Sequence, residues 1–185
     1  LLDAATDDGH GKTRFDVSAR KGQVFFVKAV GSSNSVDISF DNLVSLKDGL
    51  LTIHGTNHHD SITVQAGDGF NVNVNGIAYQ FADSEVFNVT VLGHHGKDSI
   101  DVQLGDEHDT VRTNSTGLSV VNSNFRVNAF GFQTVVVAGG GGHDVVAIND
   151  TLGYEMLTGY QSDGGYAATL EGSEFKSTAI GFDLT

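Results

Sequence analysis

The sequence contains no cysteine, no proline and no tryptophan. Without cysteine the chain can form neither a disulfide framework nor a thiolate metal site, and it has no thiol nucleophile. Long apolar runs are missing too. No stretch reaches the roughly 18 consecutive apolar residues that indicate a membrane-spanning helix. We therefore expect no membrane insertion.

Basic residues are scarce, with 10 Lys and Arg against 23 Asp and Glu and a net charge of −13. A nucleic-acid backbone repels a chain of this charge, so we expect no nucleic-acid partner. An acidic surface attracts cations instead. At 185 residues the chain is about one domain and can bury a core without covalent cross-links.

In many segments of the sequence, apolar and polar residues alternate. Apolar residues occupy every second position in several runs, for example at Leu51 and Ile53 and at Ile62 and Val64. Period two is typical of a strand with one buried face. The 24 glycines leave few stretches for helices of ordinary length. The pattern predicts an all-β fold, with one short helix allowed around residues 78–87.

Two families of internal repeats organise these strands. The segment VTVLGHHGKDSIDV (89–102) aligns with VVVAGGGGHDVVAI (135–148) at an offset of 46, and with LTIHGTNHHDSITV (51–64) at an offset of 38. In the second family, SNFRVNAFGF (123–132) aligns with SEFKSTAIGF (173–182) at an offset of 50. Such a unit buries its apolar face only by stacking on its neighbours.

The repeats predict a right-handed parallel β-solenoid (β-helix), with a β-sandwich as the alternative. If each coil takes roughly 20 residues, the chain forms about eight or nine coils. We expect an N-terminal arm over residues 1–13 and a single solenoid domain over residues 14–185. The phenylalanines are expected to stack in its core, namely Phe15, Phe25, Phe81, Phe125, Phe132, Phe175 and Phe182.

One turn carries a specific motif. GGGGHDVVA (139–147) resembles the haemolysin-type (RTX-like) calcium-binding nonapeptide G-G-x-G-x-D-x-U-x at every defined position. GHHGKDSID (93–101) differs at one position, and the copies GTNHHDSIT (55–63) and LGDEHDTVR (104–112) differ at more. The resemblance implies calcium held between stacked turns by carbonyl and carboxylate oxygens, the ligands that this cation prefers. The implied ligand positions are Asp60, Asp98, Asp109 and Asp144, with the turn glycines Gly93, Gly96, Gly139 and Gly142.

Histidines cluster beside these aspartates. Neutral imidazole binds zinc or copper, so stacked turns could align a transition-metal site. The alternative is that these histidines are solvated turn residues without a metal. The histidines concerned are His58, His59, His94, His95, His108 and His143.

About residues 51–185 resemble the repeats of large secreted bacterial surface proteins with an N-terminal LEPR-xLL signature. The resemblance rests on HDVVAINDTLGYEMLTGY (143–160), ATLEGSEFKSTAIGFD (168–183) and the opening LLDAA (1–5). It implies export, to an extracellular or cell-surface location.

No G-x-S-x-G elbow or P-loop is present in the sequence, and no arginine stands within an obvious acidic constellation. We therefore expect a non-catalytic structural protein that assembles end to end with itself into a surface or matrix filament. The run RFDVSARKGQVFFVKAV (14–30) is the expected first strand pair at that junction. The alternatives are a calcium-binding segment of a cell-surface adhesin and a polysaccharide-active β-helix enzyme. Cell-surface polysaccharide is a further candidate partner.

Overall fold

The computed structural model describes residues 6–7, 13–14, 24–28, 42–67, 69–150, 153–162 and 165–183. The chain divides into two compact units, residues 1–41 and 42–185. The sequence predicted a boundary after residue 13 instead. Residues 15–23 and 29–41 lie outside the described residues, so that boundary stays a prediction.

The described residues of the first unit include one small sheet. Strand β1 (Thr6–Asp7) pairs antiparallel with β2 (Thr13–Arg14). Most of the expected strand pair over 14–30 lies outside the described residues, and residues 24–28 have no regular secondary structure. Phe25 was expected in the core, but it is exposed, as is its neighbour Phe26.

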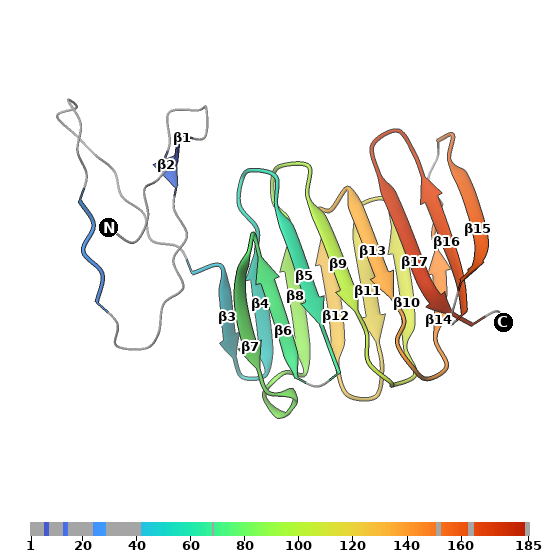
Figure 1. Ribbon diagram of the computed structural model, residues 1–185, viewed down its shortest axis with the longest axis horizontal. Helices are drawn as coiled ribbons and strands as arrows, with labels where there is room; N and C mark the ends of the chain where they lie inside the picture. The colour runs from blue at the N-terminus through green and yellow to red at the C-terminus, as the bar shows by residue number, and fades with distance from the viewer. Residues whose placement is uncertain are drawn as a thin grey trace. The chain divides into compact units, whose positions relative to one another are not determined.

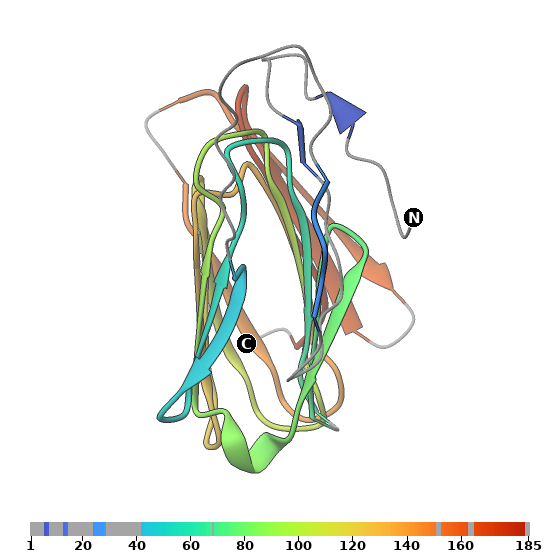
Figure 2. The same cartoon turned by 90° about the vertical axis from the view of Figure 1, so that its left-hand side faces the viewer.

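The second unit consists of two facing sheets with the core between them (Figures 1 and 2). The seven-stranded sheet has the spatial order β14 (Val145–Ile148), β10 (Thr110–Asn114), β11 (Gly117–Val121), β12 (Arg126–Phe130), β8 (Asn88–Leu92), β4 (Leu50–His54) and β3 (Val44–Lys47). The eight-stranded sheet has the order β15 (Met156–Ser162), β16 (Gly165–Glu171), β17 (Lys176–Phe182), β13 (Thr134–Ala138), β9 (Ser99–Gln103), β5 (Ser61–Gln65), β6 (Phe70–Val74) and β7 (Ile77–Phe81).

The chain winds between these sheets as a β-solenoid of about three turns. In the seven-stranded sheet β4, β8 and β12 are parallel neighbours, and in the eight-stranded sheet β5, β9, β13 and β17 are parallel neighbours. Leu51 lies opposite Val89 and Ile62 lies opposite Ile100. This register confirms the 38-residue repeat, and the all-β solenoid is confirmed with it.

The expected eight or nine coils are more than the structure describes, because a full turn takes far more than 20 residues. Stacked partners such as Ser99, Thr134 and Lys176 are 35 and 42 residues apart. Antiparallel strands account for the extra length. Strands β6 and β7 follow β5 within one sheet, and β10, β11 and β12 form a meander in the other. The sheets are therefore mixed and not purely parallel.

The 46-residue repeat relates opposite faces of the solenoid. Val89 lies on β8 in the seven-stranded sheet, whereas Val135 lies on β13 in the eight-stranded sheet. The two aligned segments therefore begin in different sheets and do not stack directly. Both cross from one sheet to the other through a turn of the same type. Their similarity means that the same turn is used at both ends of the strands.

Alternating burial along the strands builds the core, as the period-two pattern predicted. Of the predicted core phenylalanines, Phe132 and Phe182 are fully buried, Phe81 and Phe125 pack partly buried against the core, and Phe175 is half-buried. Phe15 lies outside the described residues. Phe70, which was not predicted, is buried edge-on against Phe125, with ring centroids 5.1 Å apart.

The short helix allowed around 78–87 is replaced by the end of β7 and a 3-10 turn, η1 (Asp83–Glu85). Within the described ranges no helix is long and apolar enough to cross a membrane.

Candidate functional site

The four motif aspartates lie in turns that stack on one another in two places. The turns at 55–60, 93–98 and 131–133 lead from the seven-stranded to the eight-stranded sheet and form the first turn stack. The turns at 104–109 and 139–144 lead back at the opposite ends of the strands; with residues 181–183 they form the second turn stack. The aspartates are buried within them, namely Asp60, Asp98, Asp109 and Asp144.

In the first turn stack, side-chain oxygens connect the layers in a chain of hydrogen bonds. The backbone N–H of Asp60 donates to Oδ1 of Asp98 at 2.9 Å. The N–H of Asp98 donates in turn to Oε1 of Gln133 at 2.7 Å. At the other end, the side-chain amide of Asn75 donates to Oδ1 of Asp60 at 2.6 Å. We call this series the first ladder.

The second turn stack repeats the same arrangement with different residues. The N–H of Asp109 donates to Oδ1 of Asp144 at 2.9 Å, and the N–H of Asp144 donates to Oδ2 of Asp183 at 3.0 Å. The amide of Asn122, from the β11–β12 turn, donates to Oδ1 of Asp109 at 2.9 Å. This second ladder therefore has the same order as the first: an asparagine amide, two aspartates and a terminal oxygen acceptor.

The ladders give the fixed aspartate a structural role. A buried backbone N–H without an acceptor is costly, and the turns cannot all satisfy theirs within a sheet. Hydrogen bonds to carboxylates are stronger than those between neutral groups. Asp98 and Asp144 therefore bind their turns to the layer before them, whereas Asp60 and Asp109, in the first layer of each stack, hold the hairpin asparagines Asn75 and Asn122.

Histidines make a second set of hydrogen bonds in the opposite direction. Nδ1 of His59 accepts the N–H of Lys97, and Nδ1 of His108 accepts the N–H of His143, both at 2.7 Å. Each stack thus contains a reciprocal pair. The later turn supplies the carboxylate, and the earlier turn supplies the imidazole. This requires Nδ1 to carry a lone pair, so both rings hold their proton on Nε2.

Two further histidine contacts extend the stacks. Nδ1 of His143 is 2.7 Å from Oδ2 of Asp183. Nδ1 of His54 and Nε2 of His94 share a hydrogen bond of 3.0 Å, with nearly parallel rings. Among the residues that the structure describes, no three His, Cys, Asp or Glu side chains gather into a group that could hold a metal ion. Zinc or copper binding by the turn histidines stays a prediction.

The motif glycines permit the close stacking. Gly96 and Gly142 have φ angles of +144° and +95°, and a Cβ at either would overlap a carbonyl oxygen of the preceding layer, His58 O or Glu107 O. Gly93 and Gly139 make room for the aspartate itself. A Cβ there would stand 3.0 Å from Oδ2 of Asp98 and 2.9 Å from Oδ2 of Asp144, respectively.

Burial changes the acidity of the ladder carboxyls. Desolvation raises the pKa of Asp109 from 3.8 to about 6, and it also raises the pKa of Asp98 and of Asp144. Oδ2 of Asp98 and Oδ2 of Asp109 are buried and have no hydrogen-bond partner among the described residues. Each stack therefore contains one buried carboxyl oxygen for which the described residues supply no hydrogen-bond donor.

These unused oxygens fit a calcium ion in part. Calcium takes six to eight oxygens, which turn carbonyls and carboxylates supply in ordinary sites. Here Oδ1 of each motif aspartate already accepts an N–H or amide hydrogen, and Oδ2 of Asp60 and of Asp144 accept the N–H groups of Thr56 and Gly140, so one carboxylate oxygen per stack remains for a cation. Calcium binding at the four aspartates and their glycines stays a prediction.

Four ladder residues were not predicted from the sequence: Asn75, Asn122, Gln133 and Asp183. For two of them the signal was present in the second repeat family. That alignment matched Gly131–Phe132 with Gly181–Phe182, and the next residue in each copy is Gln133 or Asp183. Extending the alignment by one position finds both terminal acceptors. The asparagines lie in hairpin turns outside the repeats.

Comparisons with protein-family models, with curated proteins and with solved structures found no match to this chain.

The histidine hydrogen bonds predict a measurable contribution from His108. His108→Ala removes the acceptor of the His143 N–H and should lower the free energy of unfolding by about 1 kcal/mol. His108→Asn should recover most of the loss, because its Oδ1 can take the place of Nδ1. Urea unfolding at pH 8 measures both, with the exposed turn histidine variant His95→Ala as control. Equal stability of the two alanine variants would contradict this role.

The raised pKa of Asp109 predicts how stability depends on pH. A carboxyl whose pKa is higher in the folded state binds its proton more tightly there, so its contribution is complete below pH 3.8 and is lost as the pH rises to about 6. That difference corresponds to about 3 kcal/mol. Asp109→Asn keeps the acceptor for Asn122 but cannot ionise. Between pH 4 and pH 6.5, wild type should therefore lose about 2 kcal/mol relative to this variant.

The control for this measurement is Asp106→Asn, an exposed position in the same turn. Its unfolding free energy should follow wild type across the pH range. If the unfolding free energy of Asp109→Asn, measured by urea titration, changes with pH in the same way as that of wild type, Asp109 is not the group that titrates.

Proposed function

We propose that the chain is a non-catalytic structural protein, a β-solenoid that assembles end to end with further copies into an extracellular or cell-surface filament. The observation that carries the proposal is the end of the solenoid at β14 and β15. These are the last strands of their sheets, and Met156, Leu157 and Tyr160 on β15 are 63%, 67% and 53% exposed. A strand that ends a sheet presents unpaired backbone groups to another chain.

The turn stacks support a structural role. Their buried carboxyls and exposed imidazoles bind successive layers of the chain to one another. The pairing repeats along the solenoid, so each layer is stabilised by its neighbours. An exported location rests on the resemblance to secreted surface repeats.

A calcium-binding segment of a cell-surface adhesin is the second candidate. The unpartnered Oδ2 atoms of Asp98 and Asp109 favour it, because a buried oxygen without a donor is a position where a cation can bind. Cell-surface polysaccharide is a proposed partner in either case. Polysaccharide cleavage is the third candidate, and a groove with two carboxylates in different environments would be needed to support it.

If the chain assembles end to end, the mean particle mass in solution should increase with protein concentration. Full-length chain should form particles much larger than 19.5 kDa in light scattering, and end-to-end filaments in negative-stain micrographs. Because the chain carries a net charge of −13, added salt should promote assembly by screening repulsion. A species of 19.5 kDa at every concentration and ionic strength would contradict the filament and leave the adhesin segment in its place.

Calcium binding predicts a rise in thermal stability. A ligand that binds only the folded state stabilises it by about 2.7 kcal/mol when its free concentration is 100 times its Kd. The unfolding midpoint of wild type should therefore be higher in millimolar calcium than in EDTA. Asp98→Asn keeps an oxygen that can accept the Asp60 N–H, but it replaces Oδ2 by an amide nitrogen and removes the negative charge. This variant should therefore show a smaller increase of the unfolding midpoint with calcium. Identical wild-type midpoints in calcium and EDTA would remove calcium from the account.

A further inference from the structure

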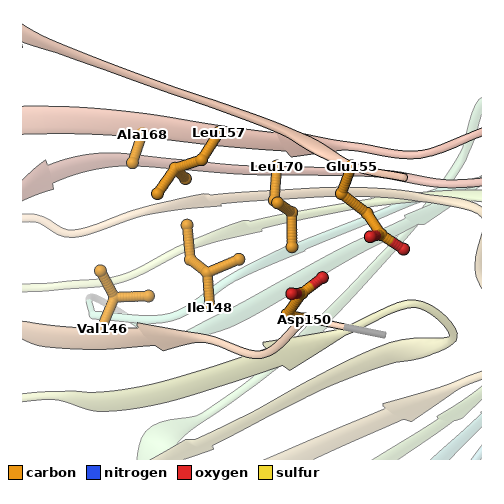
Figure 3. A pocket seen from close by; sticks show the side chains of 7 residues that line it. All are labelled: Val146, Ile148, Asp150, Glu155, Leu157, Ala168 and Leu170. Atoms are coloured by element: carbon orange, nitrogen blue, oxygen red, sulfur yellow. The ribbon is translucent and has the colours of Figure 1, made fainter. Parts of the chain in front are cut away.

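The end of the solenoid contains an apolar cleft. It lies between β14 in one sheet and β15 and β16 in the other, with a volume of about 400 Å³ (Figure 3). Asp150 and Glu155 lie on the connection between β14 and β15 and line the same cleft. The apolar lining consists of Val146, Ile148, Leu157, Ala168 and Leu170.

In the cleft, an inward-facing apolar side chain is exposed to solvent. Elsewhere the inward-facing side chains of the two sheets are mostly buried against each other, as at Val135 and Val127. On β15 the inward-facing Leu157 is 67% exposed, although it lies opposite the buried Leu170 of β16. Its neighbour Met156 does not line the cleft. An added strand would cover Leu157 and continue the pairing of β15 or β14.

A segment with complementary properties lies near the other end of the chain. Residues Val24–Lys28 read VFFVK, and their four apolar side chains are exposed, including Phe26 at 96% and Val24 at 74%. In an extended chain Val24 and Phe26 lie on one face and Phe25 and Val27 on the other. Five residues of this kind are long enough to pair with the four-residue strand β14.

Charge is complementary as well. Residues 42–185 contain 5 basic and 17 acidic residues, a net charge of −12, while residues 12–28 contain 5 basic residues and one acidic residue, a net charge of +4. Lys28 ends the apolar run, and the cleft has two carboxylates. Opposite charge steers such a segment to the cleft and fixes its orientation.

The position of the segment in the chain favours a second copy as its source. Val24–Lys28 precedes β3, and β3 is the last strand at the end of the sheet opposite to β14. To enter the cleft of its own chain, the segment would have to return along six strand spacings, about 29 Å, and the residues between Lys28 and Val44, although long enough, would lose conformational entropy on that path. In an end-to-end assembly the β3 end of one copy faces the β14 end of the next, and no such crossing is needed.

We propose that Val24–Lys28 of one copy docks as an added strand in the cleft between β14 and β15 of the next copy, with Phe26 among the apolar side chains and Lys28 beside Asp150 and Glu155. This inference rests on the proposed end-to-end assembly and names its connector. The exposed segment Val24–Lys28 of one copy and the cleft between β14 and β15 of the next copy would together form the junction.

The absence of native cysteine permits a direct test by disulfide trapping. Full-length Phe26→Cys chains are mixed with full-length Leu157→Cys chains and oxidised, since a disulfide requires Cα atoms within about 7 Å. We expect the mixed disulfide dimer to form several-fold more than with Met156→Cys, the neighbour on β15 that does not line the cleft. Equal yields with Leu157→Cys and Met156→Cys would overturn the proposal.

The double variant Phe26→Cys/Leu157→Cys identifies the source of the segment. Disulfide-linked multimers are expected at every concentration that supports assembly. A disulfide within single chains would overturn docking between copies and indicate docking within one chain.

Assembly without cross-linking gives the second readout. Leu157→Asp and Phe26→Ser should abolish large particles in light scattering, whereas Phe130→Asp and Phe130→Ser, on an exposed residue of β12 away from the cleft, should keep them. If wild type and all four variants assemble alike, the connector is wrong and the filament stands. If wild type itself remains at 19.5 kDa, the filament and the connector fail together.

Discussion

The hydrogen-bond requirement of the N–H groups in buried turns determines how this solenoid is built. A strand satisfies its backbone groups through its neighbours, but a tight turn between two sheets leaves an N–H pointing at the next layer. In both turn stacks a side-chain oxygen of the next layer accepts that hydrogen: Asp98, Gln133, Asp144 or Asp183. The glycines allow the layers to approach closely enough for this bond, and the histidines reciprocate it. These turn hydrogen bonds join the same successive coils that the parallel strands align in register.

Period two and the 38-residue repeat were enough to predict the all-β class, the solenoid and most of its core from the sequence. The number of coils could not be predicted in the same way. The apolar pattern of a strand is identical whether the next strand crosses to the other sheet or returns beside it as a hairpin. Strands β6 and β11 return, and nothing in their alternation distinguishes them from β9, which is followed by a crossing. The turns do differ: four of the crossings are six residues long and end in the motif aspartate, whereas β6 and β7 are joined by the two-residue turn Asn75–Gly76, a hairpin signal that the repeat pattern alone does not use.

The aspartates were predicted as the key residues of the turns, but the sequence could not show what they contact. A carboxylate in a glycine-rich turn can accept backbone hydrogens or bind a cation, and both need the same residue at the same place. The ladders show that the aspartates accept hydrogen bonds. Two of the donors, Asn75 and Asn122, lie in hairpin turns 15 and 13 residues after the aspartates that they contact. Such partners carry no repeat signal. Only the terminal acceptors Gln133 and Asp183 follow the repeat, one residue past its recognised end.

The ladders also have a direction along the chain. Every donated aspartate N–H goes from an earlier layer to a later one: Asp60 to Asp98 and on to Gln133, Asp109 to Asp144 and on to Asp183. A turn emerging from the ribosome therefore lacks its acceptor until the following coil has been synthesised. Removal of residues from the C-terminal side leaves an aspartate N–H of the last remaining layer without its acceptor. Removal from the N-terminal side leaves the later aspartate N–H groups paired, but it takes away the imidazole acceptors of Lys97 and His143. The two ends of the solenoid therefore lose different kinds of turn hydrogen bond when they are shortened.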